Sequence, residues 1–144
     1  MELYLPESAA KSTDPITDLL RHSQTIAVVG LSSNPLRPSH EVASYLQSVG
    51  YTIIPVNPNE SEVLGQQSYA SLEDIPIAID IVDVFRRIDQ IAPVADSAIA
   101  VHAKALWLQQ GIAHAEAAAK AKAAGLLVVE DACLLVEHKK RRPL

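Results

Sequence analysis

Apolar and polar residues follow one another along this chain in two different periods. Near-continuous apolar runs lie at five places: Thr25–Leu31, Tyr51–Pro58, Ala78–Phe85, Lys104–Gln109 and Leu126–Glu130. Runs of this length, bounded by glycine, proline and polar residues, are typical of strands that are covered on both faces. The pattern therefore predicts five buried strands in this order.

Two segments outside these runs carry clear helix signals. After Ser39, helical spacing places four apolar side chains on one face: Val42, Tyr45, Leu46 and Val49. Gly50 follows where helices commonly end. Ahead of the first strand, Asp14 is placed to cap a short helix whose first position holds Pro15.

Two further segments complete a repeating order of strand and helix. Residues 88–99 keep roughly helical spacing, with Pro93 tolerable only near a helix start or at a kink. Residues 113–125 are rich in alanine and end in glycine. Repeated strand-then-helix units predict an α/β fold with a parallel sheet and right-handed crossovers.

Residues 58–77 are the segment without a clear period. A short helical turn is expected at the sequence SLEDI, where Ser71 and Asp74 resemble a capping box with aspartate in place of glutamate. The segment need not separate two domains, because a length of 144 residues favours one domain. We expect a single domain over residues 1–144, with its core at 13–138 and a basic tail at 139–144.

Composition narrows the possible functions. The formal net charge of -5 gives no general attraction to nucleic acid, so a DNA-binding role is disfavoured. The single cysteine, Cys133, excludes an internal disulfide and the usual cysteine-based zinc spacings, which fits a reducing cytosol and a cytoplasmic location. The first 15 residues lack a signal-peptide pattern, and no apolar stretch is long enough to span a bilayer. The basic end, His138–Leu144, is expected to be disordered and solvated.

In an open parallel sheet, ligands bind at the carboxyl ends of the strands. After the first strand, Gly30 leads into a segment that supplies three hydroxyls and a cation, from Ser32, Ser33, Ser39 and Arg37. A loop of this kind before a helix start suits an anion, although the second and third glycines of the dinucleotide fingerprint are missing. The alternative is that Ser39 only caps the helix and that Arg37 is a solvated charge.

The ends of the second and third strands argue against NAD. NAD enzymes place an acid after the second strand to accept from the ribose hydroxyls, whereas this chain has Asn57 followed by Pro58. Arg86 and Arg87 follow the third strand, and their charge favours a ligand with more phosphate than NAD. The alternative for these arginines is an exposed helix start.

The remaining candidates have a structural as well as a functional interpretation. Trp107 is expected in the core or in an inter-subunit contact, with ligand stacking as the alternative. Of the five histidines, none has metal spacing, and only His40 is placed to lie at the loop. Cys133 is expected to be buried and inert, with a mixed disulfide to a thiol ligand as the alternative. Glu130 and Asp131 are adjacent on a strand, so they make a poor acid–base pair.

Five motifs in order closely resemble the small stand-alone CoA-binding proteins of bacteria: VVGLSSNPLRPSHEVASYLQSVGYTIIPVNP, VLGQQSYASLEDIP, IDIVDVFRR, ALWLQQGI and VVEDACLLVEH. That family is similar to the CoA-binding domain of the succinyl-CoA synthetase alpha subunit. The resemblance covers Thr13 to His138 and implies a Rossmann-like, doubly wound, three-layer fold with a mostly parallel five-stranded sheet.

The resemblance also implies which residues bind the ligand. The pyrophosphate loop maps onto Gly30, Ser32, Ser33, Arg37 and Ser39. Asn57 and Pro58 border the adenosine end, and Phe85, Arg86, Trp107 and Gln109 line the rest of the cleft. Two departures from the family lower the expected affinity for CoA. Asn59 and Glu60 stand where many relatives have a basic residue, and His114-Ala115 stands where relatives tend to have asparagine and glutamate.

The expected function is binding of coenzyme A or a short acyl-CoA, as a carrier or sensor, because no nucleophile–base pair is visible. No catalytic residue and no metal ligand is predicted, and nucleic acid and membrane are excluded as partners. Two alternatives stay open, a CoA- or NAD(P)-dependent enzyme of acyl transfer or reduction and a regulatory interaction protein that responds to CoA. A homo-oligomer or another protein partner is also open.

Overall fold

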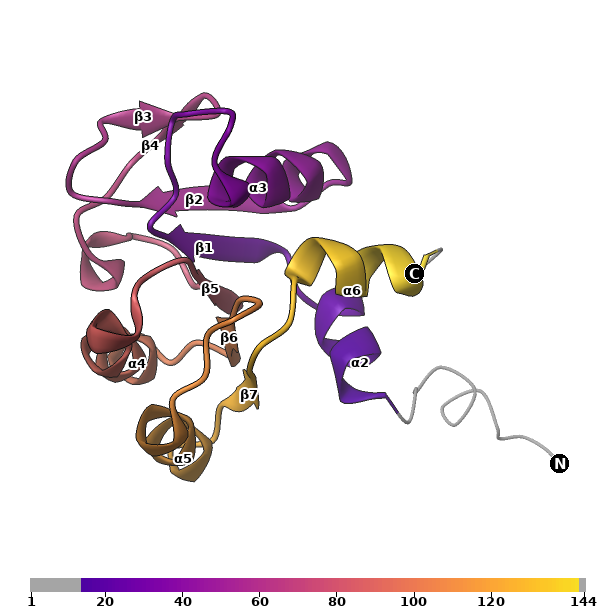
Figure 1. Ribbon diagram of the computed structural model, residues 1–144, viewed down its shortest axis with the longest axis vertical. Coiled ribbons are helices and arrows are strands. Elements are labelled where there is room, and N and C mark those ends of the chain that lie inside the picture. Colours follow the sequence, from indigo (N-terminus) through magenta and orange to yellow (C-terminus); the bar gives the residue numbers. More distant parts are fainter. Residues whose placement is uncertain (1–13, 143–144) are drawn as a thin grey trace, which may run out of the picture.

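The computed structural model describes residues 14–142, which fold around a five-stranded sheet (Figure 1). Its strands are β1 (Thr25–Val29), β2 (Thr52–Val56), β5 (Ile81–Val84), β6 (Ala105–Leu108) and β7 (Leu127–Val129). Neighbouring strands are parallel throughout, in the order β2-β1-β5-β6-β7. Each strand lies inside a predicted run, so the predicted α/β fold is confirmed. Most of the N-terminal segment in which no signal-peptide pattern is found, residues 1–13, and the last two residues of the predicted tail lie outside the described residues.

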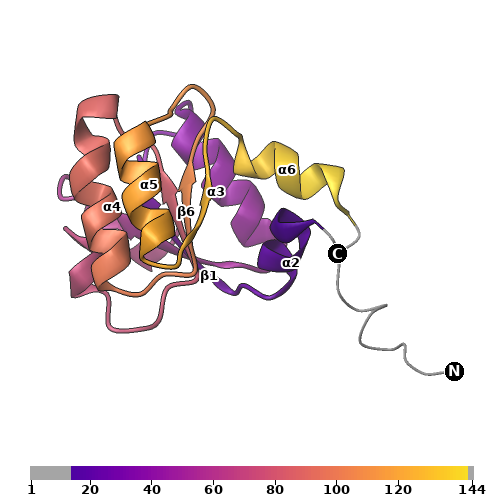
Figure 2. The same cartoon turned by 90° about the horizontal axis from the view of Figure 1, so that it is seen from below.

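Helices cover both faces of the sheet and complete three layers. One face carries α2 (Pro15–Arg21), α3 (Pro38–Ser48) and α6 (Leu134–Lys140), and the other carries α4 (Ile91–Ala100) and α5 (Ala115–Ala123), as Figure 1 and Figure 2 show. The Asp14 carboxylate accepts the Ile16 N–H and caps α2 as predicted. A 3-10 turn, η2 (Ile88–Gln90), precedes α4, so Pro93 falls in the first turn, where helices tolerate proline.

The sheet separates two apolar cores. Val82 and Val84 of β5 enter the core beneath α4 and α5, whereas Ile81 enters the core beneath α3 and α6. Asp83 has the same orientation as Ile81 because side chains alternate along a strand. An acid therefore enters the interior on the α3–α6 side, where it pairs in register with Trp107 of β6.

The strand order creates a switch point between β1 and β5. From β1 the chain crosses through α3 to β2, and it then returns to the opposite side of β1 to enter β5. Because α3 and α4 cover opposite faces, the loops after β1 and β5 diverge where these strands end. This is the position where open α/β sheets bind ligands.

Residues 58–77 contain more structure than the sequence predicts. β3 (Glu62–Val63) and β4 (Gln66–Gln67) form an antiparallel hairpin through a tight turn of positive φ. The expected helical turn is present as η1 (Leu72–Asp74), and the Ser71 hydroxyl donates to the Asp74 carboxylate without capping the backbone. The hairpin escaped prediction because strands of this length show no period.

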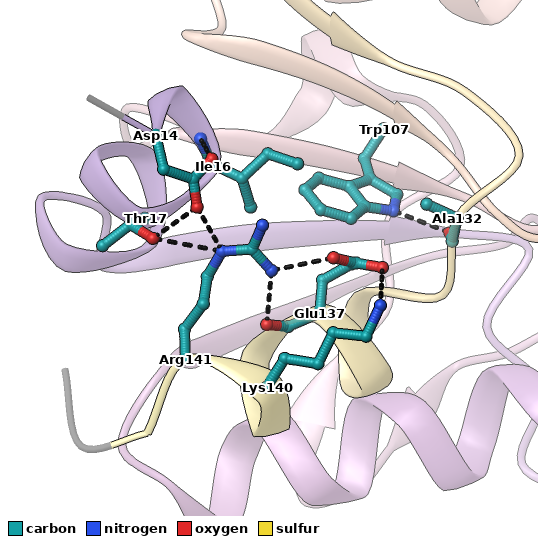
Figure 3. Close-up of polar contacts among 8 residues, drawn as sticks. All are labelled: Asp14, Ile16, Thr17, Trp107, Ala132, Glu137, Lys140 and Arg141. Atoms are coloured by element: carbon teal, nitrogen blue, oxygen red, sulfur yellow. Dashed lines mark hydrogen bonds and ion pairs between the residues drawn. The ribbon is translucent and has the colours of Figure 1, made fainter. Parts of the chain in front are cut away.

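The basic end of the chain is ordered up to the last described residue, so the expectation of a solvated tail is wrong there. His138 is buried in α6, and its Nδ1 lies 2.7 Å from the Tyr45 hydroxyl oxygen. The Arg141 guanidinium contacts Asp14 and Glu137 and ties α6 to the start of α2 (Figure 3). The expectation failed because the partners of this end lie far away in the sequence.

Replacing Arg141 by methionine is expected to lower the free energy of unfolding by about 1–2 kcal/mol. Arg141 Nε donates to Asp14 Oδ2 at 2.6 Å, and Nη1 donates to Glu137 Oε1 at 2.8 Å. Hydrogen bonds from Arg141 and then from Thr17 lower the pKa of Asp14 from 3.8 to about 2. Because the pKa of Asp14 is lower in the folded protein, its carboxylate stabilises the fold at any pH above the ordinary pKa. This contribution disappears as the pH falls from about 4 to about 2.

Urea unfolding at pH 7 and pH 2.5 measures this contribution. The difference between wild type and Arg141→Met should shrink at the lower pH. Lys140→Met is the matched control, because the Lys140 side chain is 63% exposed and lies 3.5 Å from Glu137, an arrangement worth less than about 0.5 kcal/mol. Equal losses in the two variants would show that the Arg141 contacts carry no special weight.

Candidate functional site

The loop after β1 begins at Gly30, whose φ is +89°. A Cβ at this position would lie 2.2 Å from the Phe85 carbonyl oxygen, so no side chain fits between the ends of β1 and β5. The Gly30 N–H donates to the Val56 carbonyl at 2.8 Å. Gly30 therefore lets the ends of β1, β2 and β5 meet at one point.

Hydrogen bonds within the loop hold its serine side chains in place. The Ser39 hydroxyl accepts the Ser32 N–H at 3.1 Å, and the Ser32 hydroxyl accepts the Asn34 N–H at 3.0 Å. His40 Nδ1 lies 2.9 Å from the Ser32 carbonyl oxygen, which confirms that His40 lies at the loop. The loop conformation is thus formed by the chain itself.

α3 begins slightly earlier than predicted. Arg37 occupies the N-cap position, Pro38 the first helical position, and no side chain caps the helix. Ser39 is not the N-cap, because its buried hydroxyl bonds to the loop instead. The positive dipole end of α3 and the exposed Arg37 side chain therefore adjoin the loop.

The turn after β2 is tied to this loop. The Asn57 amide donates to the Leu31 carbonyl at 3.1 Å, and Asn57 Oδ1 accepts the Asn59 N–H at 3.0 Å. The Glu60 carboxylate accepts the Ser33 N–H at 2.8 Å. Asn57 thus positions the loop backbone, and Glu60 presents an anion to one of the loop N–H groups.

A cleft with a volume of about 320 Å³ opens between the strand ends and α4. Its lining residues are Val29, Val56, Pro58, Ala70, Ser71, Leu72, Arg86, Gln90, Pro93, Val94 and Ser97. Apolar walls with a few polar groups are typical of sites for small organic ligands. Of the predicted site residues, Pro58 and Arg86 line this cleft.

Two arginines supply positive charge at the site. Arg86 is half-buried in the cleft lining, and Arg37 is exposed at the start of α3. Between residues 14 and 142 neither guanidinium forms an ion pair, so both can meet an anionic ligand. Arg87 differs, because its side chain is 81% exposed and its Nε lies 3.5 Å from the Asp89 carboxylate. Arg87 agrees with the interpretation as an exposed charge.

Trp107 and Gln109 do not line the cleft, and Trp107 belongs to the core on the α3–α6 side. Trp107 is fully buried, and its indole N–H donates to the Ala132 carbonyl at 2.9 Å (Figure 3). Gln109 is also buried, and its amide donates to Asp83 Oδ1 at 2.6 Å. The interpretation of Trp107 as a core residue is confirmed, and neither side chain offers a surface on which a ligand could lie.

Asp83 is a buried acid with an incomplete set of partners. Burial raises its pKa to about 7, against the lowering effect of the hydrogen bond from Gln109. Asp83 Oδ2 has no hydrogen-bond partner among the described residues. The Asp83 carboxyl therefore keeps its proton in the folded protein up to nearly neutral pH.

The other candidate side chains do not form a reactive group. The Glu130 carboxylate accepts the His114 N–H at 2.8 Å, and the Asp131 carboxylate accepts the Gly111 N–H at 2.6 Å. Separate partners agree with the expectation that these acids do not act as a pair. Cys133 is only half-buried, less than expected. In the described part of the chain, no metal-ligating side chains gather in threes, and no helix has the length and apolar character to cross a membrane.

Sequence reasoning missed one wall of the cleft and one acid that contacts the loop after β1. Gln90, Val94 and Ser97 of the α4 region line the cleft, but their spacing is that of any amphipathic helix. In the sequence, Glu60 stands out only as the replacement of a basic residue. Its position shortly after the second strand was the available signal, because acids there meet ribose in nucleotide-binding folds.

The fold and the crevice define the class of protein, a Rossmann-like α/β domain with a cleft at its topological switch point. Residues 24–139 match the family described as CoA binding domain, and the chain belongs to that family. The resemblance that the sequence motifs indicate is thereby confirmed.

The chain is similar to two proteins over most of their length and to a short part of a ligase subunit. The uncharacterized protein YneT of Bacillus subtilis is 45% identical over 123 residues, which cover 85% of this chain and 91% of YneT. A hypothetical protein from Pyrococcus horikoshii OT3 has a solved structure with a TM-score of 0.86 and 36% identity, covering 97% of this chain and 98% of that one. The alpha subunit of ADP-forming acetate–CoA ligase II from Pyrococcus furiosus is 35% identical over 65 residues, which are 44% of this chain and 14% of that subunit.

Proposed function

We propose that the protein binds coenzyme A, or a short acyl-CoA, in the crevice at the ends of β1, β2 and β5, and that it acts as a carrier or sensor of this ligand. The observation that carries the proposal is that the 320 Å³ cleft, which Val29 and Arg86 line, lies next to Gly30, where the preformed loop before α3 begins. Membership in the CoA binding domain family supports the same ligand.

Two parts of CoA have a matching surface here. The dipole of α3 and the Arg37 cation favour the pyrophosphate. The apolar walls and the polar rim of the cleft suit adenosine. Arg86 links the two regions, because its Cδ lies 3.5 Å from the position that a Cβ on Gly30 would take. Its guanidinium can therefore reach phosphate from within the cleft.

Binding without chemistry is supported by the lining of the cleft. The polar side chains in the lining are Ser71, Arg86, Gln90 and Ser97, and the lining includes no histidine, cysteine or carboxylate. A group that transfers protons needs a titratable side chain within hydrogen-bond reach of the ligand. The site is therefore built to hold a ligand.

Replacing Arg86 by glutamine is expected to raise the dissociation constant for CoA about tenfold or more, because charge-assisted hydrogen bonds to phosphate are lost. Arg87→Gln is the matched control, since Arg87 is 81% exposed and faces Asp89. It should change the dissociation constant by less than about twofold. Titration calorimetry measures both variants, and equal effects would remove Arg86 from the proposed site.

Titration with CoA, acetyl-CoA, NAD and NADP tests the proposed function, together with mass spectrometry of small molecules released from the freshly purified protein. We expect saturable binding of CoA and acetyl-CoA, and a released mass that corresponds to CoA or an acyl-CoA. Saturable heat with NAD alone would overturn the proposal.

A further inference from the structure

The turn after β2 holds an acid against the loop at which phosphate is proposed to bind. Glu60 Oε2 accepts the Ser33 N–H at 2.8 Å, and the Glu60 N–H donates to the Asn57 carbonyl at 3.2 Å. Pro58, on the same turn, lines the cleft. The half-buried Glu60 side chain therefore stands where the loop, the turn and the cleft come together.

The whole connection from β2 to β5 is acidic. Residues 57–80, between β2 and β5, contain no lysine and no arginine, but they include the acids Glu60, Glu62, Glu73, Asp74 and Asp80. The same connection supplies Ala70, Ser71 and Leu72 to the cleft lining. Arg37 and Arg86, in contrast, belong to the segments that follow β1 and β5. Arg37 and Arg86 thus lie on segments other than the one that carries Glu60, and Glu60 is the acid of this connection that contacts the loop.

A carboxylate at this place discriminates between two kinds of ribose. In nucleotide-binding α/β folds, an acid after the second strand accepts hydrogen bonds from the ribose hydroxyls, and an arginine takes over where the ribose carries phosphate. CoA has a phosphate on the 3′ oxygen of its ribose, and dephospho-CoA has a hydroxyl there. A hydroxyl can donate to a carboxylate, whereas a phosphate is repelled by it.

We propose that Glu60 sets the selectivity of this site against phosphate on the ribose, so that dephospho-CoA binds more tightly than CoA. The inference rests on the proposed function, because it takes the adenosine end of the ligand to bind beside the turn after β2. Repulsion by one partly exposed charge should separate the two ligands about tenfold. CoA still binds, but its phosphate must displace or outweigh the Glu60 carboxylate.

Titration calorimetry tests this proposal. It measures the dissociation constants of CoA and dephospho-CoA for three proteins: the wild type, Glu60→Gln and Glu62→Gln. Glutamine keeps an oxygen that can accept the Ser33 N–H, so Glu60→Gln removes the charge and retains the loop contact. Glu62 is the matched control, because it is exposed on β3 and carries the same charge nearby.

We expect the wild type to favour dephospho-CoA about tenfold and Glu60→Gln to bind both ligands about equally, with Glu62→Gln within about twofold of the wild-type ratio. The wild-type preference should also weaken at high salt. CoA binding at least as tightly as dephospho-CoA in the wild type, or the same ratio in wild type and Glu60→Gln, would overturn the selectivity and leave the proposed function standing. If neither ligand binds, the proposed function fails, and the selectivity fails with it.

Discussion

At pH 8, the Asp83→Asn variant will have a higher free energy of unfolding than the wild type, by as much as about 4 kcal/mol. The cause is the position of Asp83, which is fully buried in β5. Burial raises its pKa from 3.8 to about 7, and the hydrogen bond from Gln109 offsets only part of this effect. Each unit of pKa corresponds to about 1.4 kcal/mol. Asparagine keeps an oxygen for Gln109 and carries no charge.

The wild type should lose stability as the pH rises from about 4 to about 7. In this range the unfolded Asp83 carboxyl ionises while the folded one keeps its proton, so unfolding releases a proton and higher pH favours the unfolded state. Above about pH 7 the folded carboxyl also ionises, and the loss levels off. Asp83→Asn lacks this contribution, so the stabilities of the two proteins should converge near pH 4.

Asp80→Asn is the matched control, and its expected change in the free energy of unfolding has the opposite sign. Burial alone would raise the pKa of Asp80, but backbone N–H groups of Gln24 and Thr25, together with Lys104, lower it below its ordinary value. Removing this charge should therefore destabilise the protein at pH 8. Urea unfolding at pH 4, 6 and 8 measures both variants. If Asp83→Asn is no more stable than the wild type at pH 8, the interior tolerates the charge and this explanation is wrong.

Replacing Gly30 by alanine will lower the free energy of unfolding by about 2–5 kcal/mol and weaken CoA binding in the molecules that remain folded. The new Cβ would lie 2.2 Å from the Phe85 carbonyl oxygen, and the backbone φ of +89° is unfavourable for any side chain. The backbone carbonyl cannot rotate away, so the ends of β1 and β5 must separate. The phosphate loop would move with them.

Gly65→Ala separates the two causes of this loss. Gly65 also has a positive φ, of +77°, but a Cβ there meets no atom within 4 Å. Its replacement should therefore cost only the conformational part, about 1–2 kcal/mol. Thermal unfolding and titration with CoA measure both variants. Equal stability of Gly30→Ala and Gly65→Ala would mean that close contact of the strand ends does not matter.

The strands and the position of the cleft could be predicted because both follow from local pattern and topology. β1 and β5 are covered by helices on both faces, so apolar side chains fill every position of β5 except Asp83. The face of α3 was visible for the same reason, since Val42 and Leu46 point into the core. The carboxyl ends of parallel strands gather at one edge, which brings Gly30 and Arg86 together.

Contacts between side chains that are distant in sequence could not be predicted. The buried His138 meets Tyr45, which is 93 residues away, and this contact orders a segment that looks like a solvated tail. The Glu60 carboxylate reaches Ser33, 27 residues before it. Trp107 lies in a motif shared with the family, but side chains alternate along β6, and that of Trp107 points into the core. Sequence pattern finds residues near a strand end, and only the packed structure shows which of them line the cleft.

A crystal structure of the protein with CoA tests the central claim most directly. We predict electron density for the pyrophosphate beside Arg37 and the start of α3, and for adenine in the cleft beside Pro58 and Arg86. Density for CoA at another surface, or a crevice filled by the protein's own side chains at saturating CoA, would contradict the proposed site.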